Sequence, residues 1–378
     1  MIMRKIVITG GPCAGKTTAM SWIQNEFTRR GYRVLFIPET ATELISGGVA
    51  PWTCGTNLDY QKCQVRLQIE KEAIFEQAAR TMKDEKILIV CDRGGLDNRA
   101  YMTREEWEQV LGSVGIDELT LRDSYDAVFH LVTAAKGAEE AYTTANNAAR
   151  YETVEEAAAM DDKLIAAWTG HPHLKIIDNG TDFRTKLEKL IAEIVSFLGE
   201  PDPMEIERKF LIAYPDIDWL ESLPNCTKVE IEQTYLKSSP DIQIRLRKRG
   251  IDGHYIYYRS EKRPISPTRR VVLEERLSES AYIKQLADAD PEARPVRKTR
   301  YCLAENNRYY EIDLYPEWKK QAVLEIELRN AEEAVILPEG IHMIREVTGD
   351  RRYKNSSLAR AMVAEDADEN PGSGCRTE

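Results

Sequence analysis

The chain has 378 residues, about two domain lengths, and its 42% hydrophobic content is enough for two cores. The formal net charge of −11 argues against non-specific nucleic-acid binding. There is no apolar run of membrane-spanning length and no signal peptide, so we predict no transmembrane segment and a cytoplasmic location. The seven cysteines lack metal-ligand spacing and indicate reduced thiols.

The first predicted element is a phosphate-binding loop. A short apolar run at 6–9 leads into Gly-Gly-Pro-Cys-Ala-Gly-Lys-Thr, and a helical pattern follows. Backbone N–H groups of such a loop surround phosphates, Lys16 would reach the β- and γ-phosphates, and Thr17 would ligate Mg²⁺. The predicted partner is ATP or GTP. The predicted nucleotide-binding residues of the loop are Gly10, Gly11, Pro12, Cys13, Ala14, Gly15, Lys16, Thr17 and Thr18.

The rest of residues 1–199 alternates strands with helices, which predicts a parallel α/β sheet. The further strands are expected at 34–37, 86–91, 127–132 and 174–178. Asp92 ends an apolar strand, where a Walker B carboxylate would sit beside Mg²⁺. Glu39 and Asp97 are candidate bases or hydroxyl acceptors. Arg150 is a candidate γ-phosphate contact or a surface arginine. A base-contacting loop would fall at Asp178 and Asn179.

After a Pro- and Gly-rich joint at 198–204, the chain predicts strands with charged faces. In a strand, side chains alternate sides, so Glu205, Glu207 and Lys209 share one face. On one strand this is most often a solvated face. Later strands repeat the pattern, and if the sheet closes into a barrel these charges line its interior. There, like charges close together would be unfavourable unless ligands neutralised them. The basic side chains would bind an anion with several phosphates, and the carboxylates would bind hard divalent cations. The repeated pairs are Arg245 with Arg247, Lys298 with Arg300, Glu311 with Asp313, and Glu325 with Glu327.

These strands, in this order, resemble the CYTH family, the triphosphate tunnel metalloenzymes. The resemblance covers residues 205–360 and implies an antiparallel eight-stranded tunnel, a triphosphate-bearing substrate, and Mg²⁺ or Mn²⁺. It implies metal-side roles for Glu205, Glu207, Asp313, Glu325 and Glu327, with Glu274 added at poorer alignment. It implies phosphate-side roles for Lys209, Arg245, Arg247, Lys298, Arg300 and Lys354, with Lys262 added in the same way.

The first half resembles the P-loop domain of NadR-like proteins, through the phosphate loop, Pro38-Glu39, Asp92-Arg93-Gly94 and Arg150-Tyr-Glu152. The combination resembles the TRPL translocation-defect proteins, which bind guanine nucleotide and phosphoinositide. We therefore expect a P-loop domain at 1–199, a tunnel domain at 200–364 and a disordered acidic tail at 365–378.

Three functions stay open. The tunnel hydrolyses a triphosphate, with Lys209 holding or helping to activate the water. Alternatively, the protein is a GTP- and phosphoinositide-binding regulator without turnover. The third is small-molecule kinase activity in the first domain, where Asp92 and Glu39 are the candidate catalytic residues. The sequence has no Asn-Lys-x-Asp guanine motif, so base preference is open.

Overall fold

The computed structural model describes residues 2–138, 140, 153–199, 206–239, 242–266, 269–328 and 334–361. Within strands, the side chains of 206, 263–266, 269–273 and 327 are also outside the description. The chain divides into two compact units. The first contains Met1–Phe197, Leu223–Cys226 and Leu303–Tyr309, and the second contains Leu198–Ser222, Thr227–Cys302 and Tyr310–Glu378.

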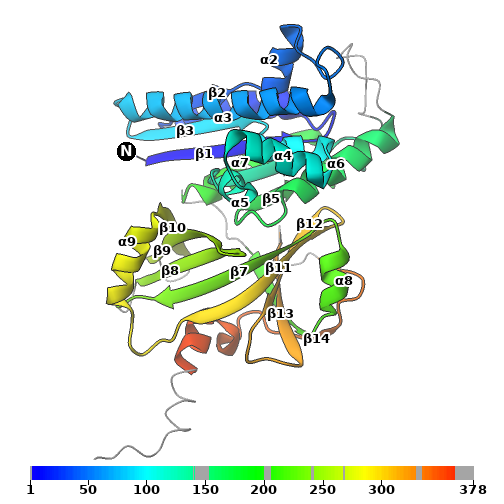
Figure 1. The fold of residues 1–378 in the computed structure, drawn as a ribbon. Coiled ribbons are helices and arrows are strands. Elements are labelled where there is room, and N and C mark those ends of the chain that lie inside the picture. Colours follow the sequence, from blue (N-terminus) through cyan, green and yellow to red (C-terminus); the bar gives the residue numbers. More distant parts are fainter. Residues whose placement is uncertain are drawn as a thin grey trace, which may run out of the picture. The chain divides into compact units, whose positions relative to one another are not determined.

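The first unit holds a parallel sheet of five strands among the described residues, ordered β2-β3-β1-β4-β5 (Figure 1). Its central strands are apolar and buried along their length, as expected when helices cover both faces of a parallel sheet. This confirms the predicted α/β class. The strands are β1 (Ile2–Gly10), β2 (Arg33–Ile37), β3 (Lys86–Asp92), β4 (Ala127–Leu131) and β5 (Leu174–Ile177).

Helices connect these strands, and several begin at capping residues. Thr103 accepts a hydrogen bond from the backbone of Glu106, whose carboxylate bonds back to Thr103, which fixes the start of α4. Thr153 and Glu156 do the same for α6. The helices are α1 (Lys16–Arg29), α2 (Thr40–Ser46), α3 (Asn57–Thr81), the 3-10 helix η1 (Gly95–Tyr101), α4 (Arg104–Val114), α5 (Glu118–Arg122), α6 (Val154–Trp168) and α7 (Phe183–Phe197).

The second unit is an antiparallel sheet of nine strands in the described part of the chain (Figure 1). The order is β10-β9-β8-β7-β11-β12-β13-β6-β14. The class agrees with the prediction, and the count exceeds the expected eight because a short strand pairs with the first one. The strands are β6 (Ile206–Ala213), β7 (Cys226–Tyr235), β8 (Gln243–Ile251), β9 (His254–Ser266), β10 (Arg269–Leu277), β11 (Val296–Glu305), β12 (Arg308–Leu314), β13 (Gln321–Leu328) and β14 (Met343–Glu346).

This sheet curves around an interior. Strands β10 and β14 end the order, and no ladder joins them among the described residues. Even so, Lys262 on β9 lies close enough to Glu207 and Lys209 on β6 for their charges to act on its pKa. Five strands separate β9 from β6 along the sheet, so only strong curvature brings these side chains together. The remaining helices of this unit are α8 (Ile217–Ser222), α9 (Glu279–Gln285) and the 3-10 helices η3 (Leu286–Asp288) and η4 (Arg351–Tyr353).

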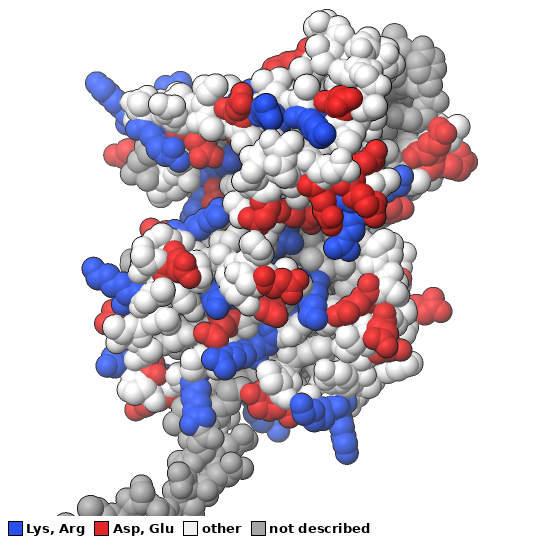
Figure 2. Space-filling model, in the orientation of Figure 1, with Lys and Arg blue, Asp and Glu red and all other residues white. Residues whose placement is uncertain are grey.

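Two expectations from the sequence concern non-specific nucleic-acid binding and membrane-spanning segments. On the face shown in Figure 2, basic side chains are interspersed with acidic ones and form no continuous basic surface. Among the described helices, none has the length and apolar character needed to cross a membrane.

Candidate functional site

The phosphate loop follows β1 and enters α1, and two of its glycines have no room for a side chain. Gly10 has φ +149° and Gly15 has φ +91°. A Cβ on Gly10 would lie 2.1 Å from the carbonyl oxygen of Leu131, and one on Gly15 would lie 2.4 Å from the ring of Phe183. Cys13 also has a positive φ of 56°. The predicted loop therefore requires glycine at both positions.

The loop is fastened from outside at three backbone groups. The N–H of Gly11 donates to Oδ1 of Asp161 at 2.9 Å. The hydroxyl of Thr133 donates to the carbonyl of Pro12, and Nζ of Lys186 donates to the carbonyl of Ala14 at 3.2 Å. These bonds hold the loop in shape before any ligand arrives, which reduces the entropy lost on binding.

Asp161 is the centre of this support, and the sequence did not single it out. It is fully buried on α6 and receives Nε2 of His130 at 3.0 Å and Nζ of Lys136 at 3.0 Å. Burial alone would raise the pKa of Asp161, but His130 and Lys136 outweigh burial and hold the pKa well below its usual range. Asp161 is therefore a fixed anion behind the loop. Nothing in its local sequence distinguishes it from the neighbouring helical acids.

Lys186 and Asn179 form a second support of the phosphate loop, and the sequence did not indicate it. Burial lowers the pKa of Lys186 to about 8, and its ammonium donates to Val132 at 2.7 Å and to Oδ1 of Asn179 at 2.7 Å. The Asn179 amide nitrogen donates to the carbonyls of Thr133 at 2.6 Å and Lys136 at 2.8 Å. Because these bonds use both ends of the amide, the Asn179 side chain helps to shape the phosphate loop. The expectation that the loop at Asp178 and Asn179 contacts a base stays a prediction.

Lys16 begins α1 and Asp92 ends β3, and the two lie close enough for their charges to interact. Burial lowers the pKa of Lys16 to about 8, and the charge of Arg93 acts in the same direction. Burial also raises the pKa of Asp92, and Oδ1 of Asp92 is buried without a hydrogen-bond partner. Thr17 is exposed at the start of α1. A hydroxyl and an unpartnered carboxylate oxygen are suitable donors for Mg²⁺, so these two residues fit the ion.

The two candidate bases differ in their surroundings. Glu39 accepts from Nε of Arg93 at 2.5 Å and from Thr42 at 2.7 Å. Burial would raise the pKa of Glu39, but Arg93 outweighs it and the pKa is lowered. Asp97 is buried and accepts from the Thr9 hydroxyl and from the N–H of Gly94 at 2.7 Å. Asp97 therefore caps η1, and its role as a base or hydroxyl acceptor stays a prediction. Arg150 lies outside the described residues.

In the second unit, one part of the interior is a network of ion pairs. Arg300 donates to Asp313 at 2.6 and 2.7 Å and to Glu325 at 3.0 Å, and it also pairs with Glu311. Lys298 pairs with Asp313, and Lys209 pairs with Glu325. Lys209 also lies 2.8 Å from Glu207. Strand register explains one contact, since Lys209 and Glu325 are opposite each other on β6 and β13.

These pairs fix the charge state of the network. Burial would raise the pKa of Asp313, but Arg300 and Lys298 hold it well below its usual range. Burial would lower the pKa of Lys209, but Glu325 and Glu207 hold it above its ordinary value. Both groups are therefore charged near neutral pH, and acid and base largely neutralise each other here.

A second part of the interior has an excess of positive charge. Arg245 and Arg247 on β8 and Lys262 on β9 lie close enough to repel, and Glu274 is 3.6 Å from Arg247. Burial lowers the pKa of Arg247 to about 10 and that of Lys262 to about 8, and in both cases Arg245 contributes next. The Nε atoms of Arg245 and Arg247 are buried without hydrogen-bond partners. We call Arg245, Arg247 and Lys262 the cation cluster.

The acids of the tunnel do not make a metal site from the described residues alone. Among these residues, no three His, Cys, Asp or Glu side chains lie close enough together to hold an ion. Glu205 and the side chain of Glu327 are outside the description. Asp313 and Glu325 already have basic partners, and Glu274 accepts from the Ser260 hydroxyl at 2.7 Å. Lys354 is exposed on the segment after η4, and no described hydrogen bond or ion pair joins its side chain to the interior.

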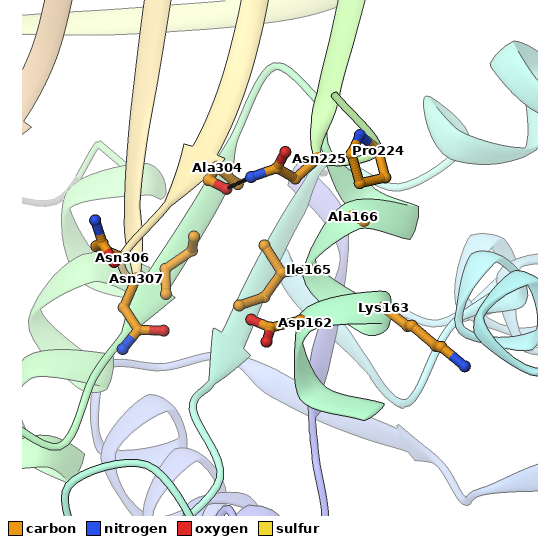
Figure 3. Close-up of a pocket in the computed structure, with 10 residues that line it drawn as sticks. Asp162, Lys163, Ile165, Ala166, Pro224, Asn225, Ala304, Asn306 and Asn307 are labelled. Carbon is orange, nitrogen blue, oxygen red and sulfur yellow. Dashed lines mark hydrogen bonds between the residues drawn. The ribbon is translucent and has the colours of Figure 1, made fainter. Parts of the chain in front are cut away.

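The pocket in Figure 3 is separate from the predicted residues. It encloses about 280 Å³, and none of the side chains singled out from the sequence lines it. The dashed line marks the bond from the Asn225 amide to the carbonyl of Ala304, which ties the segment before β7 to the end of β11 (Figure 3).

Comparison with known proteins gives a family match for the first unit. A family model described as an AAA domain matches residues 5–186, which include the phosphate loop and Lys186. No curated protein matches the chain. The first half is therefore similar to an AAA-type P-loop domain, and its relation to NadR-like proteins stays a prediction.

Several solved structures are similar to part of this chain. The inorganic triphosphatase NE1496 is 28% identical, with 42% of this chain and 96% of that chain covered, at a TM-score of 0.31. Another structure of NE1496, described as a hypothetical protein, is 29% identical, with 42% and 98% covered, at 0.31. The PH1819 protein from Pyrococcus horikoshii is 18% identical, with 34% and 81% covered, at 0.26.

Proposed function

We propose that residues 200–364 bind a triphosphate group inside the curved sheet and hydrolyse it, while residues 1–199 bind a nucleoside triphosphate on the phosphate loop. The observation that carries the first part is the cation cluster. Two buried guanidinium Nε atoms lack partners, and the pKa values of Arg247 and Lys262 are lowered because the charges are desolvated and repel one another. A polyanion relieves both costs at once.

The residues have distinct roles in this proposal. The cation cluster binds phosphate oxygens. Arg300 lies on β11, is held in place by Asp313 and Glu325, and orients the bound triphosphate. In hydrolysis, a water oxygen bonds to the terminal phosphorus as the bridging P–O bond breaks. The diphosphate leaves with the bonding electrons, and the water proton passes to solvent. Lys209 serves as a fixed cation beside this phosphorus, because its raised pKa keeps it protonated and unable to take the water's proton. Such catalysis is positioning plus neutralisation of developing charge.

The two domains differ in whether their described residues could hold a divalent cation. In the P-loop domain, Thr17 and Asp92 would hold Mg²⁺, which would neutralise phosphate charge beside Lys16. In the tunnel, the described acids do not form a metal site, and the roles above belong to the basic side chains. The expected Mg²⁺ or Mn²⁺ requirement of the tunnel stays a prediction that depends on Glu205, Glu207 and Glu327.

The test is tripolyphosphate binding and turnover by the full chain carrying Lys16→Ala, which silences the phosphate loop. We expect saturable binding by calorimetry and phosphate release with Mg²⁺ or Mn²⁺. Arg245→Ala/Arg247→Ala should lose both. Arg259→Ala is the matched control, because Arg259 is on the same strand as Lys262 but pairs with Glu261. Equal binding by the double variant and the control would contradict the assignment.

A second function, capture of a polyphosphorylated headgroup without turnover, is favoured by one specific observation. The described acids Asp313 and Glu325 are paired with basic side chains and leave no group of three ligands for a metal. On this basis, and from the resemblance to TRPL proteins, the chain would act as a GTP- and phosphoinositide-binding regulator in the cytoplasm. Binding of tripolyphosphate and of phosphoinositide liposomes, with no phosphate release under any metal condition, would select this function over hydrolysis.

A further inference from the structure

Phe183 is an exposed aromatic residue that lies against the phosphate loop. It is the first residue of α7, and 48% of its surface is exposed. One edge of its ring faces Gly15, because a Cβ on that glycine would lie 2.4 Å from Cε2 of Phe183 and 2.8 Å from Cζ. Single exposed apolar side chains are common on protein surfaces. This one differs in its position, because it borders a loop that is built to bind a ligand.

The start of α7 is held in place around Phe183. Asp182 accepts the backbone N–H of Thr185 at 3.1 Å and so caps the helix. One turn further along, Nζ of Lys186 donates to the carbonyl of Ala14 at 3.2 Å. These bonds fix the beginning of the helix against the phosphate loop. Little conformational freedom is therefore lost when a ligand covers the exposed part of the ring.

The order of the strands places Phe183 on the side of the loop where a nucleoside would lie. Asp92 ends β3, on one side of β1, whereas β4 and β5 lie on the other side. Lys16 is close to Asp92, so the γ-phosphate is expected on the β3 side. The other phosphates and the nucleoside then extend toward β5, along the carboxyl ends of the strands. Phe183 is in the helix that follows β5.

Two polar side chains between β5 and Phe183 are used within the protein. The Asn179 amide donates to two backbone carbonyls and accepts from Lys186. The Thr181 hydroxyl accepts from Nζ of Lys189 at 3.3 Å. The ring of Phe183 offers a different kind of contact, because stacking needs only the π-face that every base has.

We propose that Phe183 is the base-stacking residue for the nucleotide on the phosphate loop, and that the loop accepts ATP and GTP alike in preference to pyrimidine triphosphates. This proposal rests on the proposed nucleotide binding by residues 1–199. Stacking depends on a flat π surface and not on a pattern of donors and acceptors, so adenine and guanine bind with similar affinity. The two fused rings of a purine cover more of the Phe183 ring than the single ring of a pyrimidine.

The test measures binding by calorimetry on the full chain carrying Arg245→Ala/Arg247→Ala, so that the tunnel does not contribute. The titrants, with Mg²⁺, are ATP, GTP, UTP and inorganic tripolyphosphate, which has no base. We expect Kd values for ATP and GTP within about 3-fold of each other and a Kd for UTP about 5-fold higher, because differences in stacking strength are modest. A preference of about 100-fold for one purine would overturn the proposal, because it requires hydrogen bonds to the edge of the base.

Phe183→Leu keeps an apolar side chain against Gly15 but removes the π-face. The affinity for ATP and for GTP should fall about 10-fold, and the affinity for tripolyphosphate should stay the same. Tyr214→Ala is the matched control, because it removes another exposed aromatic ring, in the second unit, and should change none of these affinities. Equal losses for ATP and tripolyphosphate would show that Phe183 only supports the loop, and unchanged ATP affinity would also refute the proposal.

Phe183→Trp gives a signal that is specific to stacking. This variant should bind ATP and GTP as the parent does, because the indole keeps a π-face. The fluorescence that it adds to the parent's signal should be quenched by both nucleotides and not by tripolyphosphate. A parent protein that binds no nucleotide would refute the nucleotide binding proposed for residues 1–199 and this proposal with it. Normal nucleotide binding by Phe183→Leu would refute the role of Phe183 alone.

Discussion

The carboxylate of Asp161, on α6, accepts the backbone N–H of Gly11 at 2.9 Å, across 150 residues of sequence. This bond connects the phosphate loop to His130 and Lys136 through one buried anion. The loop therefore depends on a residue outside its own motif.

Asp161→Asn tests that dependence. The amide keeps the shape but removes the charge that faces Lys136, which keeps Asp162 as its remaining carboxylate partner. We expect the free energy of unfolding to fall by about 2 kcal/mol, because buried hydrogen bonds to a charged acceptor are lost. Nucleotide affinity should fall as well, because Gly11 loses a charged acceptor. Denaturant unfolding and nucleotide titration measure the two effects.

As a control, Asp162→Asn changes a neighbouring acid whose side chain is largely exposed. The free energy of unfolding and the nucleotide affinity of this variant should stay near wild type. Equal values for the two variants would contradict a supporting role for Asp161.

The pH dependence of nucleotide binding should report Lys16. Its pKa is lowered from 10.5 to about 8 in the free protein, and bound phosphates favour the charged ammonium. Affinity should therefore be constant below pH 8 and weaken from pH 8 toward 10.5, as the free protein loses the proton that binding requires. Titrations from pH 6.5 to 10 measure this. Lys16→Arg, which stays protonated, should bind with little change over the same range; a matching decline in that variant would assign the effect to another group.

Arg247→Met should change the free energy of unfolding and the affinity for tripolyphosphate in opposite directions. The wild-type guanidinium is buried, is repelled by Arg245, and has one carboxylate 3.6 Å away. An apolar side chain removes this cost, so the free energy of unfolding should rise by about 1 kcal/mol. Tripolyphosphate affinity should fall about 30-fold with the loss of a charged hydrogen bond. Calorimetry and denaturant unfolding of the same sample measure both changes. A variant that is destabilised and binds normally would show that Arg247 is a structural residue.

Acid unfolding should depend on Asp313. Its pKa is held well below the ordinary 3.8, so its contribution to stability is complete above that value and is lost as pH falls through the folded-state pKa. Wild-type stability should therefore decline steeply below about pH 4. Asp313→Asn should be less stable by about 3 kcal/mol at pH 7, because Lys298 and Arg300 lose their shared carboxylate, and its pH dependence below 4 should be shallower. Parallel stability curves for the two proteins would contradict this.

The residues that were predictable are those whose role follows from short-range pattern. The phosphate loop was readable because strand, glycines, Lys16 and helix are contiguous. The strand faces were readable because side chains alternate, and this put Lys209 with Glu207 and Arg245 with Arg247 on shared faces. That Lys209 lies opposite Glu325 follows from strand pairing, which the sequence did not specify. Short-range pattern did not show that Asp97 caps η1 or that the Asn179 amide bonds to the carbonyl of Thr133, because both contacts depend on the fold.

Sequence by itself determined the two fold classes, the phosphate loop and the charged strand faces, because each rests on periodicity or on adjacent residues. Only the tertiary structure decided which charged side chains form ion pairs and which lack a partner of opposite charge. Asp161 reaches Gly11, and Lys262 reaches the charges of β6, only because the chain folds back over long separations. The pattern of residues assigns each charge to a face. Curvature and burial, which no local pattern specifies, decide whether that charge is neutralised or left for a ligand.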